Sequence, residues 1–349
     1  MKRVTIKDLA SELNTTTSTI SRALRGHNTI SEAMIAKVKE LALERNYSIN
    51  RSAANLRSGN SKVIGVIVPR INRDFFSNCI AGIEQITKAS GYYIHIAQSH
   101  DDIKDEKEII KSMVEANVCA ILMSIGLQTS DKSHLDALNS YGIPLVFFDR
   151  ALNDEKYNKV VIDDFRGGYM ATKHLIDMGY KSIAHFTGSQ NLEIYKNRTK
   201  GYLSALNDHG IIPNRDWIEE ECLTKDLGAS ALKKMMSLPN PPDALFSSSD
   251  YSALGALLFL RTQNINVPEQ FGVVGFSNEV FTSLVSPSMS TIDQHSLDIG
   301  RNAALACINI MQNTNAVRTV SNIVIEPTLI IRESSNKLKP STKEEKPKS

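Results

Sequence analysis

Residues 5–24 read TIKDLASELNTTTSTISRAL, and this stretch decides how the chain begins. Residues 5–10 open a short amphipathic helix, residues 13–15 break it, and residues 16–24 start a second helix. Two short helices joined by a turn of about three or four residues form a helix-turn-helix, whose second helix enters the major groove of DNA. The opening therefore predicts a chain that is directed to a particular DNA sequence.

A third helix and a short linker complete the expected headpiece. After Gly26, Ser31 can cap a helix that runs from residue 32 to about residue 45. Its apolar face holds Ile35, Val38, Leu41 and Ala42. Residues 51–60, RSAANLRSGN, form a basic linker with a weak helical tendency. We therefore expect an all-helical headpiece at residues 1–50 and a hinge at residues 51–60.

Charge is divided unevenly along the chain. Residues 1–60 contain ten Lys and Arg against five Asp and Glu, a balance of +5 within a net charge of +2, so the remaining 289 residues sum to −3. A basic segment ahead of a mildly acidic body is the electrostatic pattern of a DNA-binding head on a sensor or an enzyme.

The bulk composition indicates several domains and no membrane segment. At 349 residues with 42% hydrophobic side chains, the chain can form two or three domains with real cores. It has no run of about 18 uncharged apolar residues, and Lys2, Arg3 and Lys7 interrupt any apolar signal core, so we expect a cytoplasmic protein. The cysteines, at positions 79, 119, 222 and 307, lie far apart without CxxC spacing, which favours buried free thiols over metal or disulfide roles.

Behind the linker, apolar strand-like runs alternate with amphipathic helical stretches. The predicted strands are residues 63–68, 93–97, 118–124, 145–149, 160–163, 182–188, 217–223, 244–248 and 272–277. Such alternation predicts parallel sheets covered on both faces, and two series of strands suggest two similar α/β lobes. Because ligands of open α/β sheets bind beyond the carboxyl ends of the strands, the expected pocket is the cleft between the lobes. Residues 336–349, rich in Lys, Pro, Ser and Glu, are expected to be disordered.

Several motifs follow one another in a specific order along nearly the whole chain. The head supplies TIKDLA (5–10) and TISRAL (19–24), and the junction supplies AANLRSGNSKVIGVIVP (53–69). The body adds PLVFFDR (144–150), DALFSSSD (243–250), GVVGFSN (272–278) and STIDQ (290–294). In this combination, from Val4 to about Ser334, the chain resembles the LacI/GalR family of bacterial repressors.

The resemblance implies a two-lobed, periplasmic-binding-protein-like core at residues 61–335. Lobe 1 would comprise about 61–162 and 294–322, and lobe 2 about 163–293 and 323–335. It also implies a homodimer that clamps a pseudo-palindromic operator in double-stranded DNA, with an affinity controlled by a small-molecule effector. The motifs GFSNE and TIDQH resemble those of regulators of carbohydrate use, so a sugar is the first expectation. The alternatives are a purine or another metabolite, or a repressor that no ligand switches.

In the second helix, the resemblance assigns contact with base edges to Thr17, Ser18 and Arg22. Arg22 can present its planar fork to guanine O6 and N7, or it can act only as a phosphate clamp. Thr16 is better suited to capping the helix. The full set of expected DNA contacts is Thr5, Thr16, Thr17, Ser18, Ser21, Arg22, Asn50, Ala54, Leu56 and Arg57.

The linker is the second expected reader of DNA. By resemblance, residues 51–57 fold into a hinge helix on the operator, and the paired Leu56 side chains of a dimer wedge into the minor groove. Unstacking a base step in this way costs a few kcal/mol, which extra contacts on the bent DNA offset. The alternative makes Leu56 a packing residue in a flexible tether.

Candidate effector-binding residues lie where predicted strands end. A sugar needs planar hydrogen-bonding groups for its hydroxyls and an apolar face to stack on. Strand ends supply carboxylate, guanidinium and amide groups, and the resemblance assigns a ligand contact to Arg198. The expected set is Phe75, Phe76, Asp149, Arg150, Arg198, Leu223, Asp250, Asn278 and Gln294. The alternatives are structural: a polar member caps a helix or bridges the lobes, one phenylalanine packs into the core, and Arg150 forms an ion pair between the lobes.

Two positions depart from the pattern of the family. Many members carry Asp where this chain has Ser277, and others often place an aromatic residue where it has Leu223. We therefore expect the pocket to differ from those of the best-known sugar binders. A sugar acid, a disaccharide and a phosphorylated sugar all stay open.

Other classes of function fit the sequence less well. The chain lacks a GxSxG elbow, a P-loop, a GxGxxG fingerprint and an HExxH pair, so we expect neither an enzyme nor a bound metal or other cofactor. A secreted binding protein would need a signal peptide and would not carry a helix-turn-helix head. The sequence leaves open whether the effector releases or tightens the operator, and whether the protein represses or activates transcription.

Overall fold

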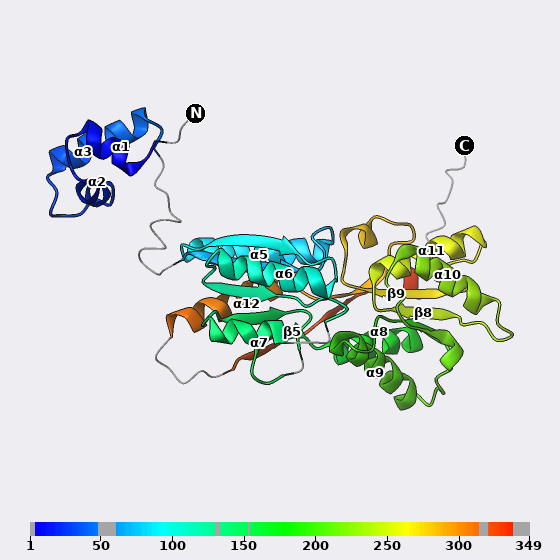
Figure 1. The fold of residues 1–349 in the computed structure, drawn as a ribbon. Coiled ribbons are helices and arrows are strands. Elements are labelled where there is room, and N and C mark those ends of the chain that lie inside the picture. Colours follow the sequence, from blue (N-terminus) through cyan, green and yellow to red (C-terminus); the bar gives the residue numbers. More distant parts are fainter. Residues whose placement is uncertain (1–3, 48–60, 130–132, 153, 314–319, 338–349) are drawn as a thin grey trace, which may run out of the picture. The chain divides into compact units, whose positions relative to one another are not determined.

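The structure, a computed structural model, describes residues 4–47, 61–129, 133–152, 154–313 and 320–337. The chain divides into two compact units, residues 1–61 and 62–349 (Figure 1). No helix in these described ranges is long and apolar enough to span a lipid bilayer.

The first unit is a bundle of three helices: α1 (Ile6–Glu12), α2 (Thr17–Leu24) and α3 (Glu32–Glu44). At the start of α1, Thr5 and Asp8 form a reciprocal capping box, in which the Thr5 amide donates to the Asp8 carboxylate at 2.7 Å. Ser31 lies at the N-cap of α3 as expected, but its side chain makes no capping hydrogen bond. The core of the bundle consists of Leu9, Ala10, Ile20, Ala23, Val38 and Ala42.

The first lobe of the second unit is built on a parallel sheet with the strand order β11-β5-β4-β3-β1-β2. Its strands are β1 (Val63–Val68), β2 (Tyr93–Gln98), β3 (Ala120–Met123), β4 (Leu145–Phe148), β5 (Asn158–Ile162) and β11 (Asn322–Ile325). Its helices are α5 (Asp74–Ala89), α6 (Ile103–Glu115), α7 (Ser133–Ser140) and α12 (Ser296–Gln312). Along β1, Ile64 and Val66 pack in one apolar core with α5 and α12, whereas Ile67 packs in another with α6 and α7. The helices therefore cover both faces of the sheet.

The second lobe repeats this plan with the strand order β12-β10-β9-β8-β6-β7, in which only β12 is antiparallel among the described strands. Its strands are β6 (Ile183–Phe186), β7 (Ile218–Glu219), β8 (Ala244–Ser247), β9 (Gly272–Phe276), β10 (Ser290–Asp293) and β12 (Thr328–Ile330). Its helices are α8 (Asp164–Asp177), α9 (Glu193–Asp208), α10 (Lys225–Met236) and α11 (Asp250–Thr262), with 3-10 turns at Arg215–Trp217, Val280–Ser283 and Glu333–Ser335. The predicted two-lobed α/β architecture is confirmed.

Three boundaries differ from the sequence prediction. Residues 323–325 pair with β5 in the first sheet, so the last crossing between the lobes comes after Ile325 and not after residue 322. The expected strand 217–223 shrinks to the two residues of β7, because Trp217 belongs to a 3-10 turn. Lys337, expected in the disordered tail, places its ammonium 3.6 Å from the centre of the Tyr180 ring. Residues 338–349 lie outside the described part of the chain.

All four cysteines are free thiols, as the sequence predicted. Cys79, Cys222 and Cys307 are buried and Cys119 is half-buried. Burial raises the pKa of the Cys119 thiol to about 11 and that of Cys222 to about 12. These thiols are therefore unreactive packing groups at neutral pH.

Candidate functional site

The second helix of the headpiece turns a polar face to the solvent. Ile20 and Ala23 hold α2 in the headpiece core, while Thr17, Ser18 and Arg22 on the opposite side are exposed. Exposed groups of this kind on the second helix can reach base edges and phosphates.

Thr5 and Thr16 both cap helices, although the sequence indicated a cap only for Thr16. The Thr16 hydroxyl accepts a hydrogen bond from the Thr19 amide at 3.2 Å, which confirms it as the cap of α2. Thr5 caps α1 and is exposed, and Ser21 is half-buried. The other expected DNA contacts, Asn50, Ala54, Leu56 and Arg57, lie outside the described residues.

A cavity of about 220 Å³ lies between the two lobes, where strands of both sheets end. Seven of the nine expected effector-binding residues line it: Phe75, Phe76, Asp149, Arg150, Arg198, Leu223 and Gln294. The two phenylalanines, both buried, meet edge to face with ring centres 5.1 Å apart. The first turn of α5 therefore supplies an apolar wall.

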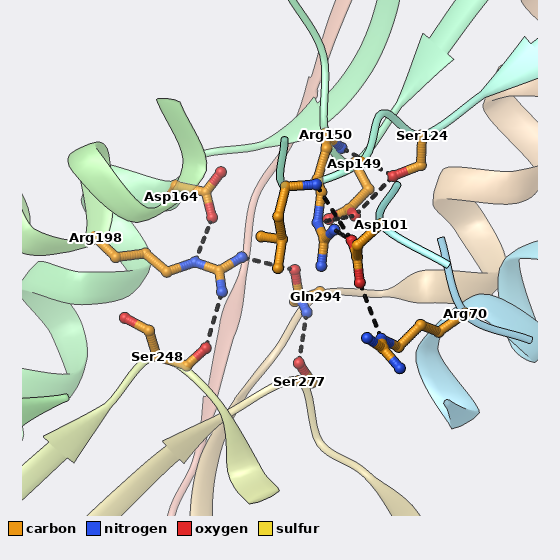
Figure 2. Close-up of polar contacts among 12 residues, drawn as sticks. Arg70, Asp101, Ser124, Asp149, Arg150, Asp164, Arg198, Ser248, Ser277 and Gln294 are labelled. Carbon is orange, nitrogen blue, oxygen red and sulfur yellow. Dashed lines mark hydrogen bonds and ion pairs between the residues drawn. The ribbon is translucent and has the colours of Figure 1, made fainter. Parts of the chain in front are cut away.

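Arg198, on α9, is the best-anchored charge of the cavity and is only 3% exposed. Its guanidinium donates to the Asp164 carboxylate at 2.7 Å, to the Ser248 carbonyl at 3.1 Å and to the Gln294 side-chain oxygen at 3.2 Å (Figure 2). The Gln294 amide then donates to the Ser277 hydroxyl at 2.8 Å. This network fixes the guanidinium and the amide before any ligand binds, which is the preorganisation that a binding site needs.

Asp164, the partner of Arg198, is buried at the start of α8. Burial raises the pKa of its carboxyl to about 7, against the opposing effect of the Arg198 charge. A carboxyl with a raised pKa balances the Arg198 charge less completely than an exposed aspartate would.

The first-lobe side of the cavity carries a chain of alternating charges. Asp101, which follows β2, receives one hydrogen bond from Arg150 at 2.6 Å and one from Arg70 at 2.9 Å (Figure 2). Burial alone would raise the pKa of the Asp101 carboxyl, but the two guanidiniums together lower it. Asp149 accepts a hydrogen bond from the Ser124 hydroxyl at 3.2 Å, and its burial raises its pKa. Arg150 thus pairs within the first lobe, which contradicts the alternative reading of an ion pair between the lobes.

Asp250 and Asn278 do not line the cavity, contrary to the sequence prediction. The Asp250 carboxylate accepts hydrogen bonds from the Thr291 hydroxyl at 2.7 Å and the Glu279 amide at 2.9 Å. The Asn278 side chain donates to Asp293 at 3.1 Å and accepts from Arg332 at 2.8 Å. Both side chains hold the ends of β9 and β10 together.

The sequence prediction missed twelve residues that line the cavity. They are Arg70, Arg73, Asp101, Leu127, Ile194, Tyr195, Thr224, Ser248, Ser249, Tyr251, Ser277 and Glu279. The strand-end rule that selected Asp149 would also have found Arg70 and Arg73 after β1 and Asp101 after β2. Tyr195 stands one helical turn before Arg198 and could have been found from that spacing.

A pair of reciprocal hydrogen bonds joins the two lobes beside the cavity. The Asp74 amide, at the start of α5, donates to the Glu279 carboxylate at 3.1 Å, and the Val280 amide donates to the Asp74 carboxylate at 3.2 Å. We call these two bonds the lobe latch. Burial, followed by the nearby charges of Asp74 and Asp250, raises the pKa of Glu279 to about 7.

The chain resembles known proteins over nearly its whole length. The family model described as periplasmic binding proteins and sugar binding domain of the LacI family matches residues 61–333. The ribose operon repressor of Haemophilus influenzae is 29% identical over 335 residues, covering 96% of this chain and 99% of that protein. The HTH-type transcriptional repressor CytR of Escherichia coli K12 is 31% identical over 334 residues, covering 96% and 97%. The solved lac repressor dimer, bound to operator and the anti-inducer ONPF, shares the fold at a TM-score of 0.83 and 20% identity, covering 96% and 99%.

Proposed function

The chain belongs to the LacI family, and from this premise we propose that it is a transcriptional repressor whose operator affinity is set by a carbohydrate effector. The observation that carries the proposal is the presence, in one chain, of a capped helix-turn-helix and a two-lobed core with a preorganised cavity. The repressor names of the relatives support the DNA partner, and the lac repressor dimer on its operator supports a homodimer. The protein would act in the cytoplasm, where its DNA partner lies.

We propose that α2 reads the major groove of each half-site of a pseudo-palindromic operator. Arg22 is the residue best suited to base discrimination, because its exposed guanidinium can donate twice to one guanine. Thr17 and Ser18 are short and add weaker contacts. We assign the minor-groove wedge to Leu56, and Leu56→Gly should weaken operator binding far more than nonspecific binding. Equal losses on the two DNAs would contradict the wedge.

For the effector, we propose that sugar hydroxyls bind the Arg198–Gln294 network. These two side chains carry N–H and C=O groups that hydrogen bonds hold in place, which suits the hydroxyls of a sugar. Phe75 and Phe76 supply the apolar surface for the sugar ring. The ribose operon repressor, named for a sugar operon, supports this ligand class.

The switch would act through the relative orientation of the lobes. The cavity and the lobe latch both join the two lobes, so a ligand that fits one orientation shifts the equilibrium between orientations. The shift can be no larger than the difference in the ligand's affinity for the two states. That orientation would set the spacing of paired hinge segments in the dimer, and so the operator affinity.

The test uses the full chain and an operator selected from random DNA. Operator affinity is measured by fluorescence anisotropy with and without each member of a carbohydrate panel, with nucleobases as the comparison. The key variant is Arg198→Met combined with Asp164→Asn, because removing Arg198 alone would leave a buried carboxylate without its partner. We expect this variant to bind operator within about twofold of the parent and to lose the sugar response. The control is Arg215→Met, at an exposed arginine that does not line the cavity.

The outcomes separate the candidate functions. A response to carbohydrates that the double variant abolishes supports the proposal. A response only to nucleobases would assign the cavity to purines instead. Sequence-specific DNA binding that no small molecule changes would identify a repressor without a ligand switch.

A further inference from the structure

Three guanidiniums gather on the first-lobe wall of the cavity. Arg70 and Arg73 come from the loop between β1 and α5, and Arg150 follows β4. The carboxylates of Asp101 and Asp149 line the same wall. Three fixed positive charges therefore face two carboxyl groups, one of which, Asp149, has a raised pKa because it is buried.

Arg150 has most of its hydrogen-bonding capacity unused. A guanidinium carries five N–H donors, and among the described residues only Asp101 accepts a hydrogen bond from the Arg150 guanidinium. Its Nε is buried without any such partner and lies 3.9 Å from the nearer Asp149 oxygen. Arg150 lines the cavity, so the terminal N–H groups that Asp101 does not take can serve an acceptor that the protein itself does not supply.

Arg73 is held in place without using its donors. Its guanidinium carbon lies 3.5 Å from the centre of the Tyr251 ring, so the charge stacks on the face of the aromatic ring. In the part of the chain that the structure describes, Arg73 donates no hydrogen bond to a protein acceptor. Stacking leaves the N–H edge of the guanidinium available to a ligand in the cavity.

The second-lobe wall does not balance this charge. Arg198 has its own partner in Asp164, and the remaining acid that lines that side, Glu279, has a pKa raised to about 7 by burial. Among the residues that line the cavity, four arginines therefore stand against three carboxyl groups, and the raised pKa values of two of those groups add to the positive excess. The cavity also holds the buried Ser248 hydroxyl, which has no partner among the described residues.

We infer that the effector is an acidic carbohydrate of about monosaccharide size, whose carboxylate or phosphate binds Arg150 and Arg73 while its hydroxyls bind the Arg198–Gln294 network. This inference rests on the proposed function. A planar guanidinium binds a carboxylate or phosphate through two parallel hydrogen bonds, which makes arginine the residue suited to such a group. The cavity volume of about 220 Å³ falls below the roughly 300–1,000 Å³ of drug-sized pockets and so favours a single sugar ring.

The experiment is isothermal titration of the full chain with matched pairs of ligands. Hexuronates, aldonates and sugar phosphates are each compared with their neutral parent sugar, and inorganic phosphate is titrated alone. Since a hydrogen bond to a charged group contributes about ten- to a hundredfold in affinity, an acidic member should bind at least about tenfold more tightly than its parent. The carboxylate and phosphate arms identify which anionic group the wall accepts.

Two variants test the assigned arginines. Arg73→Met removes a charge that makes no hydrogen bond within the described structure, and it should reduce the preference for the acidic ligand over its neutral parent about tenfold. Arg150→Met should have a larger effect, and its thermal unfolding without ligand shows whether the fold survives. Arg215→Met, an exposed arginine, is the matched control.

The outcomes show whether the acidic-ligand inference fails alone or together with the carbohydrate switch. Tighter binding of a neutral parent than of its acid, or an acid preference that Arg73→Met and Arg150→Met leave unchanged, overturns this inference but leaves the carbohydrate switch intact. Binding of inorganic phosphate alone, with no sugar bound, overturns it in favour of a simple anion site. Failure of every carbohydrate to bind overturns both proposals.

Discussion

Replacing Leu9 by alanine should unfold the headpiece and leave the effector core intact. Leu9 is fully buried at the centre of the small core formed by α1, α2 and α3. A Leu→Ala change at such a site costs about 2–5 kcal/mol, through lost burial and the cavity left behind. A domain as small as residues 1–61 rarely holds more than about 3–5 kcal/mol of stability. Most or all of the headpiece stability is therefore lost.

The assay exploits the single tryptophan of the chain. Trp217 lies in the second lobe and is 9% exposed, so its fluorescence reports the unfolding of the core alone. We expect Leu9→Ala to abolish operator binding in fluorescence anisotropy while the tryptophan unfolding curve stays unchanged. The matched control is Leu43→Ala, because Leu43 is 79% exposed on α3 and its loss should change stability by less than about 0.5 kcal/mol. Operator binding by Leu9→Ala equal to that of the parent would refute this reasoning.

Three further changes test other parts of the structure. Arg22→Ala should relax base preference in each half-site by about 1–3 kcal/mol, measured on operator variants; a smaller salt dependence with unchanged preference would make Arg22 a phosphate clamp. The pKa of Glu279 is about 7 in the fold against an ordinary value of 4.5, so its contribution to stability is complete below about pH 4.5 and is lost as pH rises through 7. Between pH 4.5 and 7, the Tm of Glu279→Gln should therefore change less than the Tm of the parent. Equal changes in the two proteins would contradict the raised pKa of Glu279. Gly300→Ala would place a Cβ 2.0 Å from the Cys79 carbonyl oxygen, so α12 and α5 must separate at a cost of about 1–3 kcal/mol, visible as a lower Tm; an unchanged Tm would show that the helices adjust freely.

The sequence predicted the elements of the fold more reliably than their ends. Alternating apolar runs and amphipathic stretches located most of the strands and helices of the body, because buried parallel strands and packed helices impose different periodicities. The sequence prediction placed the last crossing between the lobes three residues too early, after residue 322 instead of Ile325. The short edge strand β11 is defined by its pairing with β5, which lies about 160 residues earlier in the chain. Pairing over such a distance leaves no local signal.

The sequence located several of the residues that line the cavity. Asp149 and Arg150 line the cavity because they directly follow the buried strand β4 at its carboxyl end, and Arg198 because it faces the same cleft from α9. Applied evenly, the same rule would have found Arg70, Arg73 and Asp101. Arg70, Arg73 and Asp101 lie outside the motifs that carry the resemblance, so those motifs gave no sign of them.

Asp250 shows why position at a strand end is not enough. It follows β8 as Asp149 follows β4, yet as the first residue of α11 its carboxylate turns away from the cavity to the Thr291 hydroxyl and the Glu279 amide. Gly275 on β9 leaves room for this carboxylate, because a Cβ at Gly275 would lie 2.1 Å from the Asp250 Oδ1 atom. A glycine inside a buried strand signals the close approach of another group. Asp250 and Gly275 together therefore indicate that this carboxylate is structural.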